Sequence, residues 1–454
     1  MSLRPLSPRA RRLGAAALAA LAAVTLAGCA SASAAPVPTA GSLATLDPSK
    51  KVTITFESYN LANAGIWSNT ITTLLDEFHQ AHPNITVNAQ PTDSTSTAGS
   101  VQKELLAGKA PDVAQLVFSE LDFAATTLGA NNLTTLVGKA GLDQEFGGQY
   151  PYNARAKGLA DWKGATYGIP YVFSTPVLWI NESMFQQAGL DPKTVDLSTW
   201  DAVKAAGQKI TAATGKPSVS VTCVVTGGNW CMQGLFRSNG AQVLSDDRTK
   251  IGFGSDAAVS TVQTFRDMFG AGVLANQDST GMYEAFAKGQ TAIHVNTSAL
   301  QGAFMAGAKA GNWTLSARRL PAFGTKPVVP TNSGSFLAMF SKDPAKQAAS
   351  WELMKWMTSP QAYEAISTKI GYLPLRDAMT KQGGPLYDWT EQNPLVKPNL
   401  AQLNELQPWV SYPGNSYAQV DQVLATAVEN SVFYGGDVKK TMTDAATRAQ
   451  GLIK

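Results

Sequence analysis

The stretch GATYGIPYVFSTPVLWINESMFQQAGLDP, from Gly164 to Pro192, decides how this chain folds. It is apolar enough to form buried strands, yet Ser174-Thr175-Pro176 interrupts its middle. Proline has no amide proton, so Pro176 marks a point where pairing with a neighbouring strand fails. The two hydroxyls beside it either face a polar site or hydrogen-bond locally at a bend.

Upstream of this stretch, the pattern predicts alternating strands and helices. In residues 66–81, Ile71, Leu74, Leu75 and Phe78 fall on one face of a predicted helix, which His82-Pro83 ends. Residues 99–110 predict a second helix. The strands that we expect around these helices are 51–56, 84–90 and 111–117.

This β-α-β-α-β order implies parallel strands joined by helical crossovers. In sheets of this kind, small molecules bind beyond the carboxyl ends of the strands. We therefore expect a site near three loops, which are Glu57–Gly65, Thr92–Ala98 and Phe118–Phe123.

The second half of the chain carries similar units, and residues after Gly371 are mostly helical in pattern. Residues 343–371 predict a helix pair in which Pro360 begins the second helix, and Trp351 and Trp356 belong to the core. We find no internal repeat. The remaining predicted elements are strands at 218–225, 290–296 and 334–340 and a helix at 257–272.

The N-terminus has the pattern of an export signal. A positively charged segment precedes an apolar run that is too short for a comfortable membrane span, and the run ends at Leu26-Ala27-Gly28-Cys29. Small residues directly before a cysteine resemble a bacterial lipobox. We expect a signal peptide at 1–28, a lipidated Cys29 and a tether over 29–49, which has no aromatic residue. The alternative is an ordinary signal peptide with an incidental cysteine.

Composition and charge favour a soluble globular protein and give no indication of nucleic-acid binding. Hydrophobic residues make up 44% of the chain and charged residues 15%. The formal net charge is +3, and Arg4, Arg9, Arg11 and Arg12 precede Cys29, which leaves −1 for the rest. The sequence shows no basic patch interleaved with aromatic residues.

Two cysteines, Cys223 and Cys231, remain if Cys29 is lipidated. An even pair in an exported protein suggests a disulfide, and two reduced thiols in the core are the alternative.

The sequence contains no motif of a known catalytic machinery. Neither a Walker-type phosphate loop nor a G-x-S-x-G nucleophile elbow occurs. The three histidines are scattered, so we expect no metal site, and His294 reads as a hydrogen-bonded strand residue. We predict no enzyme activity and no cofactor. A secreted glycan hydrolase, which needs two carboxylates facing one pocket, stays as an alternative.

Several stretches resemble the extracellular solute-binding proteins (family 1) of bacterial ABC importers. The opening stretch, followed by STWDAVKAAGQKI (198–210), is similar to the family's aromatic-G-I-P strand, crossing strand, short helix and T-W helix start. Further similarity lies in FAKGQTAIHVNTSAL (286–300), GSFLAMFSKDPAKQAASWELMKWMTSPQAYEAIS (334–367) and GYLPLRDA (371–378). Their shared order covers nearly the whole chain.

The resemblance implies an α/β fold: a two-lobed periplasmic-binding-protein clamp, type II-like, in which each lobe is a mostly parallel sheet flanked by helices. We expect residues 50–165 plus 294–345 in lobe 1 and residues 166–293 plus 346–454 in lobe 2. The segment with Ser174 and Thr175 would then cross between the lobes and present its hydroxyls to a polar ligand.

Candidate binding residues combine aromatic faces with polar groups, as sugar-like ligands require. Some follow predicted strands, and the resemblance adds Trp230 as a stacking residue, a glycine-rich turn at Gly334 and the tyrosine of G-Y-L-P. The full set is Tyr59, Asn60, Glu120, Ser174, Thr175, Trp230, Asn296, Thr297, Ser298, Ser333, Gly334 and Tyr372.

The S-T-P and G-Y-L-P segments favour the family's glycerol-3-phosphate and glycerophosphodiester binders, but two departures oppose that ligand. An acidic residue is usual after the first strand, where this chain has Asn60 and Asn63. A late arginine is also usual, and YPGNSYAQVDQVL (412–424) has none. We therefore expect a neutral carbohydrate or another polyol, with glycerol phosphates as the alternative.

The partners that the resemblance implies are the membrane subunits of an ABC permease, and we expect a monomer that binds no nucleic acid. The protein would be exported and held on the outer face of the cell membrane through the lipid on Cys29.

Overall fold

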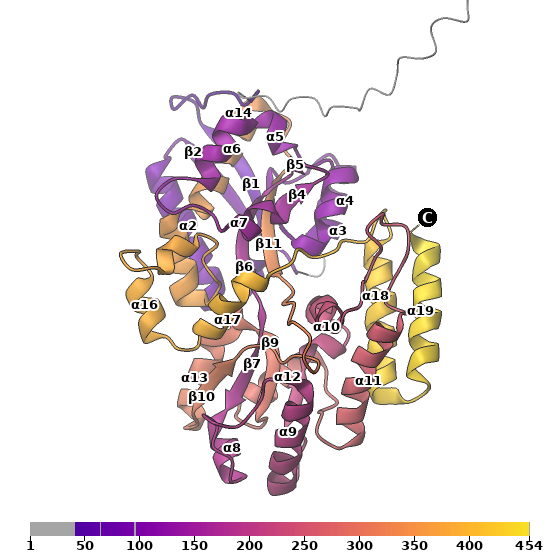
Figure 1. Cartoon of the computed structure of the whole chain (residues 1–454). Helices are drawn as coiled ribbons and strands as arrows, with labels where there is room; N and C mark the ends of the chain where they lie inside the picture. The colour runs from indigo at the N-terminus through magenta and orange to yellow at the C-terminus, as the bar shows by residue number, and fades with distance from the viewer. Residues whose placement is uncertain (1–40, 64, 95–96, 454) are drawn as a thin grey trace, which may run out of the picture.

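The computed structural model describes residues 41–63, 65–94 and 97–453 and shows two lobes, each built on its own sheet (Figure 1). The predicted signal peptide, Cys29 and the tether up to residue 40 lie outside the described residues. Within the described part, no helix combines the length and apolar character needed to cross a membrane.

Lobe 1 contains a five-stranded sheet in the order β2-β1-β3-β11-β6. β1 pairs in parallel with β2 and β3, as the predicted β-α-β-α-β order requires. β11 is antiparallel to both of its neighbours, so one strand runs against the other four. The strands are β1 Val52–Ser58, β2 Ile85–Pro91, β3 Val113–Val117, β6 Ile169–Ser174 and β11 Ser333–Met339.

Lobe 2 contains a four-stranded sheet in the order β10-β7-β9-β8, and here β7 alone runs against the others. The predicted fold class, an α/β clamp of two lobes with mostly parallel sheets, is therefore confirmed. The strands are β7 Pro176–Asn181, β8 Val219–Val221, β9 Ile293–Thr297 and β10 Leu315–Arg318. A separate hairpin pairs β4 Asp161–Trp162 with β5 Ala165–Thr166.

The helix predicted at 66–81 forms in lobe 1 and buries the face that the sequence predicts. In α2 the apolar side chains from Ile71 to Phe78 are buried, and the Trp356 indole N–H donates to the Leu74 carbonyl at 2.9 Å. The helices are α1 Tyr59–Ala62, α2 Ile66–Ala81, α3 Thr97–Leu106, α4 Leu121–Thr126, α5 Leu133–Leu136, α6 Gly138–Phe146, α7 Ala154–Lys157, α14 Pro344–Met357, α15 Pro360–Ala365, α16 Tyr387–Gln392 and α17 Lys397–Gln402.

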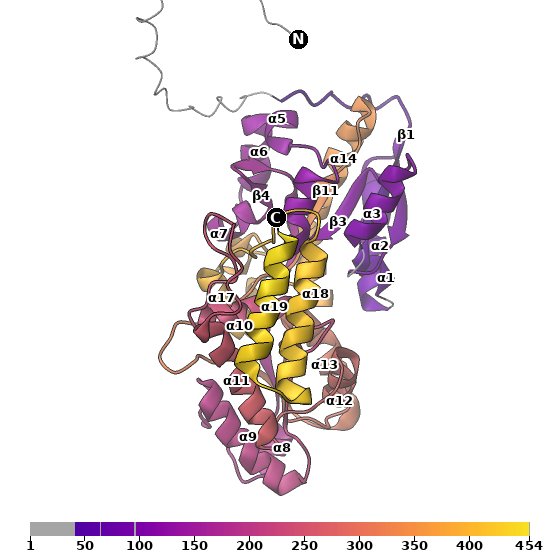
Figure 2. The same cartoon turned by 90° about the vertical axis from the view of Figure 1, so that its right-hand side faces the viewer.

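The helices of lobe 2 cover both faces of its sheet. Val177 and Trp179 of β7 pack with Phe286 and Phe304 on one face, and the larger core lies on the other. The helices are α8 Glu182–Gln187, α9 Trp200–Thr214, α10 Met232–Ser238, α11 Asp256–Gly270, α12 Ser279–Ala287, α13 Gln301–Gly311, α18 Tyr417–Glu429 and α19 Val438–Leu452. Figure 2 shows α18 and α19 side by side along this lobe.

The chain crosses between the lobes three times, and the crossings differ from the predicted boundaries. The first lies between β6 and β7, the second between β10 and β11, and the third near residues 407–411. β6 therefore belongs to lobe 1, β9 and β10 belong to lobe 2, and α14 packs in lobe 1. Because β6 and β7 are both buried on every residue, their apolar pattern does not tell which sheet each one joins.

Ser174-Thr175-Pro176 forms the first crossing, which explains the interruption in the opening stretch. Ser174 pairs with Ser333 in lobe 1, and Pro176 pairs with Thr297 in lobe 2. Thr175 lies between the two sheets, so the strand pairing changes from one sheet to the other at this residue.

Candidate functional site

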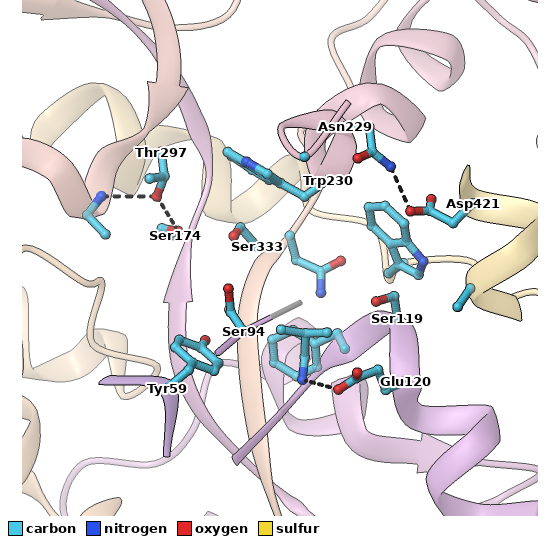
Figure 3. A pocket seen from close by; sticks show the side chains of 18 of the residues that line it. Tyr59, Ser94, Ser119, Glu120, Ser174, Asn229, Trp230, Thr297, Ser333 and Asp421 are labelled. Carbon is cyan, nitrogen blue, oxygen red and sulfur yellow. Dashed lines mark hydrogen bonds between the residues drawn. The ribbon is translucent and has the colours of Figure 1, made fainter. Parts of the chain in front are cut away.

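A cavity of about 600 Å³ lies between the two lobes. Lobe 1 lines it with residues from all three loops that the sequence singles out, such as Tyr59, Ser94 and Glu120, and lobe 2 lines it with Asn229 and Asp421 (Figure 3). The cavity therefore lies beyond the carboxyl ends of β1 and β3, where sheets of this type bind small molecules.

Most of the predicted binding residues meet at this cavity. Glycine 334 lines it with its backbone, which has φ +123, and a Cβ there would lie 2.0 Å from the Val172 carbonyl oxygen of β6. Only glycine allows this close approach of β11 to β6. The predicted residues that line the cavity are Tyr59, Glu120, Ser174, Trp230, Thr297, Ser333, Gly334 and Tyr372.

Two predicted residues, Thr175 and Ser298, do not line the cavity because their hydroxyls bind a neighbouring amide. Thr175 donates to the side-chain oxygen of Asn399, whose amide group donates to Ser298. Gln402 also donates to the Thr175 hydroxyl at 2.7 Å. These bonds tie α17 of lobe 1 to the first crossing, so both residues have a structural role here.

Asn296 also points away from the cavity, because successive side chains of a strand alternate between its two faces. Its amide group lies 3.1 Å from Nε2 of His294, and the Ser220 hydroxyl lies 2.8 Å from Nδ1 of the same ring. Burial lowers the pKa of His294 to about 3, so the imidazole is neutral. This agrees with a hydrogen-bonded strand residue, and the adjacent Thr297 faces the cavity instead.

Asn60 is buried behind the cavity wall. Its side-chain oxygen accepts from the Tyr372 hydroxyl at 3.4 Å, and Tyr372 itself lines the cavity. Burial and the neighbouring Tyr59 raise the pKa of Tyr372, which keeps this hydroxyl protonated and able to donate. Asn60 thus supports a cavity residue without being one.

Glu120 is 3% exposed, and three donors converge on its carboxylate. Oε2 accepts from the Val117 backbone N–H at 3.0 Å, and Oε1 accepts from the Ala98 N–H at 3.3 Å and from the Tyr417 hydroxyl at 3.1 Å. Burial raises the pKa of Glu120 to about 7, and these hydrogen bonds oppose the rise. Because Tyr417 lies in α18 of lobe 2, Glu120 also joins the two sides of the cavity.

The residues that the sequence analysis missed include Asp421 and its partner Asn229. The Asn229 amide donates to Asp421 Oδ2 at 2.7 Å, and burial raises the pKa of Asp421 (Figure 3). The segment 412–424 was singled out only for its lack of arginine, yet it supplies Tyr412, Tyr417 and Asp421 to the cavity. The available signal was the spacing of Tyr417 and Asp421, which are four residues apart and therefore lie on one face of α18.

Aromatic rings line the cavity on both lobes. Trp67 packs edge-on against Tyr372 in lobe 1, with ring centroids 5.2 Å apart, and both face the cavity. Trp230 and Tyr412 line it from the side of lobe 2, and Trp409 lines it from the third crossing between the lobes. These rings offer apolar faces next to hydroxyl, amide and carboxyl groups, the combination that suits a polyhydroxylated solute.

The loop that carries Trp230 is closed by a disulfide between Cys223 and Cys231. Cys231 directly follows Trp230, and the loop residues Thr226 and Asn229 also line the cavity. The bond therefore restricts the part of lobe 2 that faces lobe 1.

The described residues that line the cavity include carboxyl groups but no basic side chain. Among the described residues that line it, Glu120 and Asp421 are acidic and none is lysine, arginine or histidine. The described part of the chain also contains no cluster of three metal-ligating side chains.

Two further contacts bridge the lobes through residues that line a separate hollow and not this cavity. Arg248 of lobe 2 donates to the Asp122 carboxylate of lobe 1 at 2.5 Å. Thr127 of lobe 1 donates to the side-chain oxygen of Asn415 at 2.7 Å. With the Glu120–Tyr417 bond, these contacts hold the lobes in the arrangement described here.

Comparison with known proteins identifies relatives along most of the chain. A family model described as "Bacterial extracellular solute-binding protein" matches residues 73–398. The arabinooligosaccharide-binding protein of Bacillus subtilis (strain 168) is 30% identical over 113 residues, which is 23% of this chain and 23% of that protein. The chain thus matches about a quarter of the length of this relative.

Solved structures share the fold over nearly their whole length. UgpB from Mycobacterium tuberculosis, in complex with glycerophosphocholine, gives a TM-score of 0.75 at 20% identity and covers 88% of this chain and 98% of that chain. The cyclic alpha-maltosyl-1,6-maltose binding protein from Arthrobacter globiformis gives 0.73 at 20% identity, with 89% and 99% covered. At 20% identity the structural similarity shows the fold alone, and the match to the family model shows the family. This chain belongs to the bacterial extracellular solute-binding proteins.

Proposed function

We propose that this protein captures a neutral carbohydrate in the cavity between its lobes and delivers it to the permease of an ABC importer. The observation that carries the proposal is the lining of the cavity: aromatic faces, hydroxyls, amides and two carboxyl groups, with no basic side chain among the described lining residues. Rings stack on the apolar faces of a sugar, and carboxyl and amide oxygens accept hydrogen bonds from its hydroxyls.

A phosphorylated ligand suits this cavity less well. A phosphate dianion would lie near Asp421 and Glu120 without a guanidinium or ammonium group to balance its charge. Glycerophosphocholine is the second candidate, because UgpB is similar in fold and because Trp and Tyr rings beside a carboxylate suit a quaternary ammonium group.

Hydrolysis is the competing activity, since two carboxyl groups face one cavity. In Glu120, however, both oxygens already accept hydrogen bonds from Val117, Ala98 and Tyr417. We infer that this group holds the lobes together and does not act as a general acid on a glycosidic bond.

The lipidated Cys29 and the attachment to the outer face of the cell membrane belong to the same proposal. The lipobox-like segment before Cys29 supports them, as does membership of an extracellular solute-binding family. Lipidation would keep the protein close to its permease. Globomycin treatment of the producing cells, followed by mass spectrometry of the N-terminus, tests this part.

Thermal unfolding of the full chain with a panel of compounds tests the ligand class. The panel contains arabino-oligosaccharides, maltose, maltotetraose, glycerophosphocholine and sn-glycerol 3-phosphate. A compound that binds only the folded protein raises the melting temperature. We expect a rise with at least one sugar and no sugar hydrolysis by chromatography after overnight incubation. A rise with the phosphate compounds alone, or release of smaller sugars, would contradict the proposal.

A further inference from the structure

Asn332 lies at the second crossing between the lobes, and its position is fixed on both sides. The preceding Thr331 packs against lobe 2, where its hydroxyl lies 3.4 Å from the Cys231 carbonyl oxygen. A Cβ on Gly234 of α10 would lie 2.0 Å from that hydroxyl, so this packing leaves no free space. The following Ser333 pairs with Ser174 in the sheet of lobe 1. Asn332 is therefore the one residue between Thr331, which lobe 2 holds, and Ser333, which the sheet of lobe 1 holds.

The Asn332 side chain is buried without a hydrogen-bond partner. The residue is 2% exposed and lines the cavity, and neither Nδ2 nor Oδ1 has a partner among the described residues. An unpaired buried amide is destabilising, because it loses its bonds to water and gains none in return. Tyr412, at the lobe 2 end of the third crossing, also lines the cavity, and its buried hydroxyl forms no hydrogen bond with any residue that the structure describes.

The two crossings are also in contact, since Thr331 forms an isolated bridge with Gln407. Two of the three connections between the lobes thus each place a polar group without a described hydrogen-bond partner on the cavity. The carboxyl group of Asp421 lines the same cavity. A side-chain amide offers one acceptor and one donor group side by side, which matches two adjacent hydroxyls.

We propose that Asn332 is the residue that orients the bound sugar, and that the site selects an uncharged sugar with two free vicinal hydroxyls at this position. Oδ1 accepts a hydrogen bond from one hydroxyl, and Nδ2 donates a hydrogen bond to the oxygen of the next. The Tyr412 hydroxyl supplies a further contact from the neighbouring crossing. This inference rests on the proposed function, because it assigns the groups that hold the carbohydrate. It also places the ligand on the connections whose bending changes the angle between the lobes.

The test compares Asn332→Leu with wild type and with a matched control, Asn181→Leu. Asn181 is 1% exposed and lies away from the cavity, and its amide is fully used: Nδ2 donates to the Gly289 carbonyl and Oδ1 accepts from the Ser183 N–H, both at 3.1 Å. All full-length chains are unfolded thermally without ligand and titrated calorimetrically with arabino-oligosaccharides and maltotetraose. Asn332→Ala serves as a second, smaller replacement.

Without ligand, we expect Asn332→Leu to melt at or above the wild-type temperature, whereas Asn181→Leu melts lower. For the sugar that binds, we expect both Asn332 variants to raise Kd by about 10- to 100-fold and the control to leave it unchanged. A fall in melting temperature for Asn332→Leu as large as that of the control would show that the amide is paired within the protein and would overturn the inference.

An unchanged Kd in both Asn332 variants would overturn the inference while leaving the carbohydrate proposal intact. If no sugar binds the wild type, the carbohydrate proposal itself fails, and the sugar-orienting role of Asn332 fails with it. The melting temperatures still report in that case whether the amide is unpaired.

Discussion

The burial of Glu120 predicts how the stability of the protein depends on pH. The folded pKa of about 7 lies above the ordinary value of 4.5, because burial disfavours the charged form. Between these two pH values the folded protein therefore keeps a proton that the unfolded chain has released. The contribution of Glu120 to stability is complete below pH 4.5 and is lost as the pH rises to 7.

The expected size follows from the two pKa values. Their difference, at about 1.4 kcal/mol per unit, corresponds to a loss of about 3 kcal/mol in the free energy of unfolding between pH 4.5 and 7. Glu120→Gln removes the titrating proton but keeps the shape of the side chain. The variant should therefore lack this part of the pH dependence.

The free energy of unfolding of wild type and of Glu120→Gln is measured by urea unfolding, followed by tryptophan fluorescence, at half-unit steps from pH 4.5 to 8. Burial also raises the pKa of Glu57 to about 8 and that of Glu145 to about 7, but both groups titrate alike in the two chains. The difference between the curves therefore isolates Glu120. Parallel curves for wild type and Glu120→Gln would show that Glu120 does not titrate between pH 4.5 and 7 in the folded protein.

Three further predictions concern the cavity, a contact between the lobes and the disulfide. Trp230→Ala should raise the Kd of the bound sugar by about 10- to 100-fold in calorimetry, because a stacking face is lost, and should leave the ligand-free melting temperature nearly unchanged. An unchanged Kd would show that Trp230 does not contact the sugar. Arg248→Ala should speed sugar release about 3- to 10-fold in stopped-flow measurements, since it breaks the contact with Asp122 between the lobes; equal release rates would contradict this role. The double variant Cys223→Ser/Cys231→Ser should lose about 2–3 kcal/mol of stability in urea unfolding, because its short loop is no longer closed in the unfolded chain; equal urea midpoints would count against it.

The sequence predicts the local structure well where periodicity is strong. The helix at 66–81 and the three strands of the first β-α-β-α-β unit appear as expected, because each buries one regular apolar face. The lobe boundaries were not predictable in the same way. β6 and β7 are both fully buried, and nothing in their pattern distinguishes which sheet they join.

The cavity was predictable in its loops and less so in its individual side chains. Strand topology places the loops after β1, β2 and β3 at one edge, so Tyr59, Ser94 and Glu120 meet there. Asn296 and Thr175 were expected at the cavity, but strand alternation and a partner on α17 turn them away. Contributions from the lobe crossings, such as Asn332, depend on long-range packing that local sequence does not encode.

A carbohydrate site between the lobes is best tested by calorimetric titration of the full chain with maltotetraose, arabino-oligosaccharides and sn-glycerol 3-phosphate, side by side. We expect saturable one-to-one binding of at least one of the neutral oligosaccharides and no heat from sn-glycerol 3-phosphate. Binding of the phosphate with no heat from any of the sugars would contradict a carbohydrate site between the lobes.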